Sequence, residues 1–171
     1  MEPMTKTMPE DNAPFCFHQY RAKPNWAQIV LSLYITFVFC QSLFYKFSDA
    51  PETQHIFGTL DGWAAGFGFP GLFISGGIFS AKVIGSFELI SSILLILSLI
   101  TQRAVLRVAG SLLSMGIITG AIFFHLFTPL GIVVQDDGGL LFIMACGVWL
   151  SAACILFLDR HYIFKTLGLR F

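Results

Sequence analysis

Four long apolar stretches constrain the fold of this chain more than any other feature, because each is long enough to cross a lipid bilayer. A membrane-spanning helix needs about 20 mainly apolar residues. The stretches cover residues 26–47, 83–100, 104–127 and 140–158. Because a backbone in lipid must satisfy its own hydrogen bonds, we predict an all-α fold, a four-helix transmembrane bundle that forms one domain over residues 26–158.

The composition supports a membrane protein and excludes several other classes. Hydrophobic residues make up 56% of the chain and charged residues 12%, whereas a soluble domain carries about 25% charged residues. The net charge is zero, and the basic residues lie beside apolar stretches instead of forming a patch. We therefore expect the lipid bilayer as the main partner and no nucleic-acid partner.

The basic residues are unevenly distributed between the two sides of the predicted bundle. Lys46 and Lys82 lie on one side, and the other eight lie on the opposite side: Lys6, Arg21, Lys23, Arg103, Arg107, Arg160, Lys165 and Arg170. Cytoplasmic connections carry the excess of lysine and arginine. We therefore predict a multi-pass protein of the cytoplasmic (inner) membrane with both termini in the cytoplasm.

Three segments lie outside the four stretches. Residues 1–25 are polar and rich in proline, so we predict a disordered or interfacial cytoplasmic tail. Residues 159–171 mix basic and apolar side chains, which predicts a cytoplasmic interfacial tail, either helical or frayed. In the connection 48–82, residues 63–80 are apolar but interrupted by glycine and proline. We expect a re-entrant or interfacial segment that covers the outer end of the bundle; a fifth span is the alternative.

Glu88 is the most informative single residue, because it interrupts the second apolar stretch. An ionisable group within a span is costly, so it usually faces the protein interior and has a partner or a function. At 1.5 Å per residue, it lies roughly 9 Å from the outer end of its helix. Its carboxyl group could be protonated and bonded to Ser92 or Gln41, or charged and paired with Lys46 or His125.

The predicted topology brings other polar residues to the same end as Glu88. We hypothesise a ligand pocket near the outer leaflet, with these candidate residues: Gln41, Tyr45, Lys46, Glu88, His125, Asp136 and Asp137. Each also has a structural interpretation. Lys46 could extend to the headgroups, His125 could donate to a carbonyl, and the two aspartates could form a turn that favours the following helix dipole.

No recognised catalytic or metal-binding motif occurs in the chain. The acidic and histidine residues lack a metal-ligand spacing, so we predict no metal site and assign no catalytic residue. Residues 116–120, with the sequence GIITG, match the small-xxx-small pattern of helix contacts. This pattern could serve a neighbouring helix within the chain or a second subunit in a homodimer.

Five segments resemble, in their order and spacing, the DoxX-like family of small bacterial membrane proteins. They are FCQSLFYKF, SDAPETQHIF, GSFELISSILLI, GAIFFHL and GIVVQDDGGLLF. The resemblance covers roughly Ile29 to Arg160 and implies a four-helix membrane bundle. It also implies that Lys46, Glu88, His125 and the turn at 136–139 match the recurring polar positions of the family. One departure is the linker 63–82, which is longer and more apolar than is usual in the family.

The family resemblance leaves the function open among three hypotheses. The first is an accessory or ligand-binding membrane subunit. Some relatives are linked to thiosulfate–quinone oxidoreductases, which implies a second hypothesis: a quinone-binding subunit with a redox-protein partner, in which Glu88 and His125 move protons. The third is a small proton-coupled transporter that uses Glu88. The sequence leaves open whether the protein is an enzyme.

Overall fold

The computed structural model describes residues 22–166. The predicted N-terminal tail up to residue 21 therefore lies outside the described residues. No strand occurs between residues 22 and 166. The helices there are α1 (Trp26–Phe47), α2 (Pro51–Ala65), α3 (Ala81–Thr101), α4 (Ala104–Phe127), α5 (Leu140–Leu158) and α6 (Arg160–Thr166).

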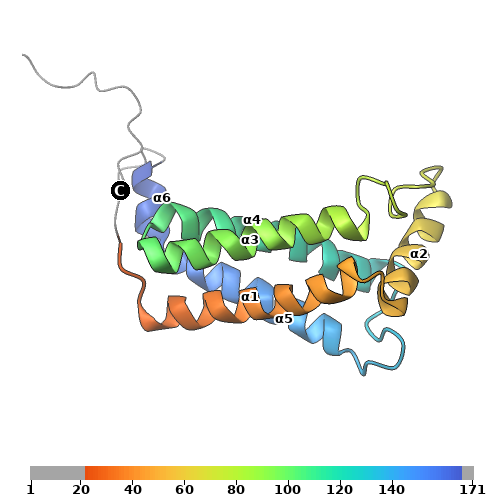
Figure 1. The fold of residues 1–171 in the computed structure, drawn as a ribbon, viewed down its shortest axis with the longest axis horizontal. Coiled ribbons are helices and arrows are strands. Elements are labelled where there is room, and N and C mark those ends of the chain that lie inside the picture. The colour runs from red at the N-terminus through yellow and green to blue at the C-terminus, as the bar shows by residue number, and fades with distance from the viewer. Residues whose placement is uncertain (1–21, 167–171) are drawn as a thin grey trace, which may run out of the picture.

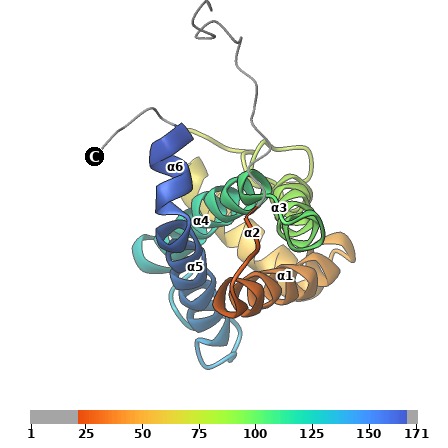
Figure 2. The ribbon, with the colours of Figure 1, turned by 90° about the vertical axis from the view of Figure 1, so that its left-hand side faces the viewer.

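Helices α1, α3, α4 and α5 form an elongated bundle, with α2 across one end and α6 at the other (Figure 1). All four are long and apolar enough to cross a membrane, which confirms the predicted all-α bundle and a multi-pass membrane protein. Seen along the bundle, α1 and α4 each lie beside both α3 and α5 (Figure 2). We call the end with α2 the cap end, and the end with α6 the basal end.

The predicted helix boundaries agree closely with the structure. Helices α1, α4 and α5 have the same bounds as the predicted stretches. Helix α3 extends the predicted 83–100 by two residues at its start and one at its end. Gln102 ends α3 because it adopts the left-handed conformation (φ 56°). At the start of α1, the side chains of Asn25 and Gln28 each accept a hydrogen bond from the other residue's backbone amide, which forms a capping box.

Close packing and buried hydroxyl groups join α3 to α4. Lipid tails are as apolar as leucine, so helices in a membrane associate through tight contacts and hydrogen bonds. The Ser91 hydroxyl donates to the carbonyl of Gly110 over 2.9 Å and lies 2.6 Å from the Ser114 hydroxyl. A Cβ atom at Gly110 would lie only 2.9 Å from Cγ of Leu95. Glycine at this position therefore sets the distance between the two helices.

We expect Gly110→Ala to lower the free energy of unfolding by about 1–3 kcal/mol, the usual cost of overpacking a tight contact. Gly116→Ala is the matched control on the same helix, because a Cβ atom there meets nothing within 4 Å. Alanine also has the higher helix propensity, so the control should be neutral or slightly stabilising. Unfolding of both variants in mixed micelles checks this, and equal effects would contradict it.

The cap end contains a helix that the sequence analysis does not predict. This helix, α2, precedes the expected interfacial or re-entrant segment 63–80 and overlaps it only at residues 63–65. Proline occupies the first turn of α2, and Thr53, Leu60 and Ala64 form its buried face. Residues 66–80 then turn back over the bundle. The Asp61 carboxylate accepts hydrogen bonds from the amides of Gly71 (3.3 Å) and Phe73 (3.0 Å), which hold this loop to α2.

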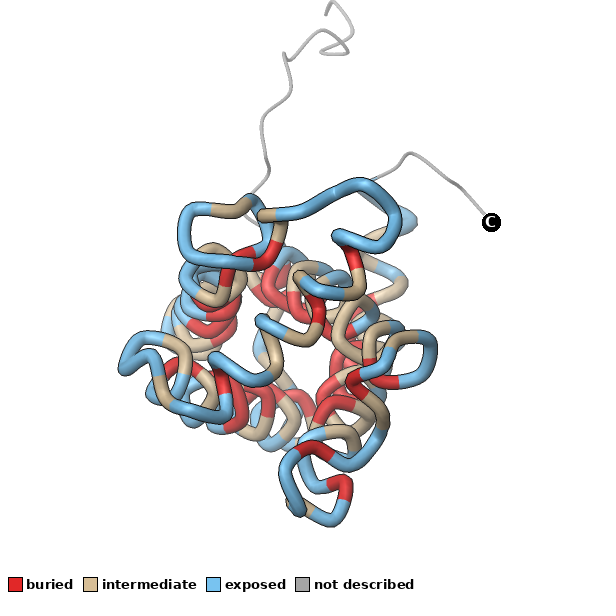
Figure 3. Tube along the Cα trace, turned by 90° about the vertical axis from the view of Figure 1, so that its right-hand side faces the viewer, coloured by how far each residue is buried: buried red, intermediate tan, exposed pale blue. Residues whose placement is uncertain are grey.

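The cap has its own apolar core. Leu60 and Phe73 are buried together with Leu130 and Val134 from the connection between α4 and α5. The ring of Phe73 also lies edge-on against that of Phe124, with 5.3 Å between their centroids. Seen from the cap end, buried positions face the bundle axis and exposed positions form the outer rim (Figure 3). The cap is thus a packed layer over the end of the bundle.

Candidate ligand cavity at the cap end

A cavity of about 650 Å³ lies beneath the cap, between the ends of the four long helices. Its wall is mainly apolar and includes side chains from α2 as well as from the bundle. Cavities of about 300–1,000 Å³ with a few polar groups are typical of sites for small molecules. We call this space the cap cavity.

Six of the seven candidate residues line the cap cavity: Gln41, Tyr45, Lys46, Glu88, His125 and Asp137. The exception is Asp136, which is exposed and adopts the left-handed conformation (φ 63°) in the turn before α5. The structure therefore brings together side chains from α1, α3, α4 and the connection 128–139. These elements meet because neighbouring helices in the bundle run antiparallel. The ends of α1 and α4 and the starts of α3 and α5 therefore lie at the cap end.

Lys46 and Glu88 form an ion pair in the cavity wall. The distance from Nζ to Oε1 is 2.5 Å, and the side chains are 14% and 4% exposed, respectively. The same Nζ donates to the Ser42 hydroxyl over 2.7 Å. Gly85 permits this approach of α1 to α3, because a Cβ atom there would lie 3.3 Å from Phe47 Cε2. Lys46 therefore turns into the protein instead of extending to the headgroups.

The second carboxylate oxygen of Glu88 is the most unusual atom in the cavity wall. Oε2 is buried and accepts no hydrogen bond from any residue between 22 and 166. The Ser92 hydroxyl donates to the backbone carbonyl of Glu88, not to its carboxylate. A buried acceptor left without a donor costs about 1–3 kcal/mol, and more when it is charged. Glu88 thus brings to the cavity wall a carboxylate whose second oxygen has no donor among the described residues.

His125 presents one ring nitrogen to the protein. Its Nδ1 lies 2.7 Å from the carbonyl oxygen of Gly131, and a carbonyl can only accept, so Nδ1 carries the hydrogen. In the neutral ring, Nε2 is then the nitrogen that can accept a proton or a hydrogen bond. The ring also lies edge-on against Phe142, at 5.7 Å between centroids. His125 therefore combines the predicted carbonyl contact with a place in the cavity wall.

Asp137 organises the turn that precedes α5. Its Oδ1 accepts from the amides of Val134 (2.8 Å) and Gly139 (2.9 Å), and its Oδ2 accepts from that of Leu141 (3.0 Å). Burial by itself raises the pKa of Asp137. The hydrogen bonds from these three amides and the charge of His125 lower it by a larger amount, so the pKa lies below the usual value of aspartate. Both predicted roles, turn formation and a place in the cavity wall, occur together at this residue.

The lowered pKa predicts a pH dependence of stability. Because the carboxylate is favoured in the folded state, its contribution is complete above the pKa of the unfolded chain, about 3.9, and is lost as the pH falls through the lower folded-state pKa. We expect Asp137→Asn to lower the melting temperature at pH 7 and to approach the wild type as the pH falls below about 4. Melting curves from pH 7 to 3 check this; a constant difference would contradict it.

The glycines of the GIITG motif serve the cavity and not a helix contact within the chain. Gly116 and Gly120 both belong to the cavity wall, and a Cβ atom at either meets nothing within 4 Å in the described part of the chain. Their missing side chains leave space beside Ile117, Ala121 and Phe124. The small-residue pattern therefore enlarges the cap cavity.

Two parts of the site were not predicted from the sequence. Ser42 lies one helical turn before Lys46, a spacing that could have predicted its contact with the ammonium group. The wall provided by α2, which includes Thr53 and Ile56, depends on a tertiary arrangement for which the sequence has no local signal. Among residues 22–166, no three histidine, cysteine, aspartate or glutamate residues lie close enough to hold a metal ion.

Comparisons with protein-family models, with curated proteins and with solved structures found no match for this chain. The DoxX-like resemblance therefore stays a prediction.

Proposed function

We propose that this chain is a ligand-binding subunit of the cytoplasmic membrane, with both termini in the cytoplasm and the cap cavity near the outer leaflet. The observation that carries the proposal is that Glu88, which lines a cavity of about 650 Å³, has a buried carboxylate oxygen, Oε2, that accepts no hydrogen bond from residues 22–166. The excess of basic residues at the basal end supports this orientation.

The chemistry of the wall defines the class of ligand. Most of the lining side chains are apolar, and the charged ones are Lys46 and Glu88, which form an ion pair, together with Glu52 and Asp137. A molecule that fits has an apolar body and a head with at least one O–H or N–H donor for the free carboxylate oxygen. Such an amphiphile can enter from the bilayer, where apolar molecules concentrate.

A quinol is the ligand that one further observation favours. Its oxidation releases two electrons and two protons. Glu88 and His125 both belong to the cavity wall, and each has a group that can accept a proton, the Oε2 oxygen and the Nε2 nitrogen. The electrons would go to a partner redox protein. The second candidate function is therefore the membrane subunit of a quinone-linked oxidoreductase, as the DoxX-like resemblance also implies.

The bound molecule can be identified directly. We expect native mass spectrometry of the protein in a mild detergent to reveal a copurified amphiphile, and Gly120→Phe to remove it, because the ring fills the space beside α4. Ala109→Phe is the matched control, because Ala109 lies on an exposed position of the same helix and outside the cavity wall. Equal retention of the molecule by both variants would refute the proposal, and a copurified quinone would support the second candidate.

A further inference from the structure

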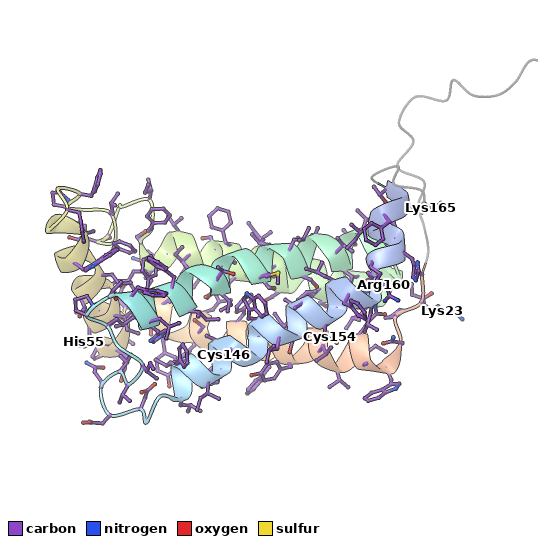
Figure 4. The ribbon with its side chains drawn as sticks, turned by 180° about the vertical axis from the view of Figure 1, so that it is seen from behind. Lys23, His55, Cys146, Cys154, Arg160 and Lys165 are labelled. Atoms are coloured by element: carbon purple, nitrogen blue, oxygen red, sulfur yellow. The ribbon has the colours of Figure 1, made fainter. Side chains whose placement is uncertain are left out.

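A second cavity, of about 210 Å³, lies at the basal end, at the opposite end of the bundle from the cap cavity. Lys23 and Gln28 line it from the start of α1, Arg107 from α4, and Asp159 and His161 from the junction of α5 and α6. In Figure 4, Lys23 and Arg160 lie at this end and His55 at the other. We call this space the basal cavity.

Arg107 is the central residue of the basal cavity: its charge is paired with that of Asp159, but its hydrogen-bond donors are only partly used. Its Nε and Nη2 each donate to one carboxylate oxygen of Asp159 over 2.6 Å. The side chains of Arg107 and Asp159 are 1% and 7% exposed. The third nitrogen, Nη1, is buried and has no acceptor among residues 22–166. A guanidinium group carries five N–H donors, and two of them donate to Asp159. The two N–H groups of Nη1 have no partner there.

Several other polar side chains of the wall offer donors, and His161 and Tyr162 complete its polar lining. The side-chain oxygens of Asn25 and Gln28 accept the two hydrogen bonds of the capping box, which leaves their amide nitrogens to donate. Both oxygens of Asp159 accept from Arg107. The ammonium group of Lys23 can only donate. The wall therefore has several N–H donors, and it carries the positive charges of Lys23 and Arg107 against the single carboxylate of Asp159.

We propose that the basal cavity binds a phosphate-bearing anion. A phosphate group presents several acceptor oxygens, and arginine with lysine is the usual combination that binds it. The volume is equivalent to about seven waters at their share of roughly 30 Å³ each, enough for a phosphate group. The anion is either a free phosphate or the headgroup of an anionic lipid; the two share the same chemistry.

Gln28→Glu is the most direct test. Glutamate at this position keeps the capping box, but it places a carboxylate where the amide donor was and so competes with the anion for Arg107. Lys23→Ala removes one exposed cation, and Lys82→Ala, at the cap end, is the matched control. The probes are inorganic phosphate and short-chain phosphatidylglycerol; phosphatidylcholine of the same chain length, whose headgroup has no net charge, is the lipid control.

We expect phosphate, phosphatidylglycerol or both to raise the melting temperature of the wild type in a saturable way. Lys23→Ala should weaken this binding about tenfold, the loss of one charge-assisted hydrogen bond, Gln28→Glu should abolish it, and Lys82→Ala should leave it unchanged. A response to phosphatidylglycerol alone identifies a lipid as the source, and a response to inorganic phosphate identifies a soluble anion. If neither probe acts, or if Gln28→Glu responds like the wild type, the proposal is wrong.

Discussion

Arg107→Ala is expected to lower the free energy of unfolding by about 3–5 kcal/mol, because it leaves the buried carboxylate of Asp159 without its partner. Asp159 lies just beyond α5, 7% exposed. Both of its carboxylate oxygens accept hydrogen bonds from Arg107. The loss is large relative to the 5–15 kcal/mol by which typical proteins are stable, so the variant should be poorly folded in detergent.

The double variant Arg107→Met, Asp159→Leu separates the charge effect from the packing effect. Replacing both members of a buried ion pair with apolar residues of similar volume is often neutral or stabilising. We therefore expect the double variant to recover most of the stability that Arg107→Ala loses. Unfolding in mixed micelles measures both, and a double variant as unstable as the single one would show that the ion pair itself stabilises the bundle.

The second large effect is expected on ligand binding. In the double variant Lys46→Met, Glu88→Leu, the bundle should fold with a stability close to that of the wild type, again because both charges are removed together. The copurified amphiphile should be lost, because Glu88 Oε2, the acceptor for its head group, is gone. The measurement is native mass spectrometry together with a melting curve on the same preparation.

Single substitutions at Glu88 separate the loss of the charge from the loss of the hydrogen-bond acceptor. Glu88→Leu alone leaves the partly buried ammonium group of Lys46 with the Ser42 hydroxyl as its remaining partner among residues 22–166, so we expect a clear loss of stability. Glu88→Gln keeps the shape of the side chain but removes its negative charge, and an NH₂ group takes the place of one of the two carboxylate oxygens. A double variant that still retained the amphiphile would show that the Lys46–Glu88 pair is only structural, and the proposed function would then be wrong.

The predictions from the sequence are accurate for features that depend only on the local composition of the chain. An apolar stretch of about 20 residues has one stable solution in lipid, a helix, so the bounds of α1, α4 and α5 follow from composition alone. The start of α2 also carries local signals, proline in the first turn and an apolar residue spacing of three and four. They were outweighed by the polar character of residues 48–57.

The polar partners were less predictable. The depth of Glu88 in its span leaves Lys46 and His125 as equally good partners, and the choice depends on Gly85, which brings α1 close to α3. The Arg107–Asp159 pair was missed because both residues lie near span ends, where basic residues are ordinarily taken as topology signals. Arg107 is nevertheless the fourth residue of α4, deep enough to require a partner.

The sequence by itself determined the four helices and the end of the bundle at which Glu88 lies, since hydrophobicity and helical rise act along the chain. Only the tertiary structure decided which charges pair, that α2 closes the cap cavity, and that Gly116 and Gly120 widen it. Those outcomes depend on the distances between helices, which arise from contacts between residues far apart in the chain.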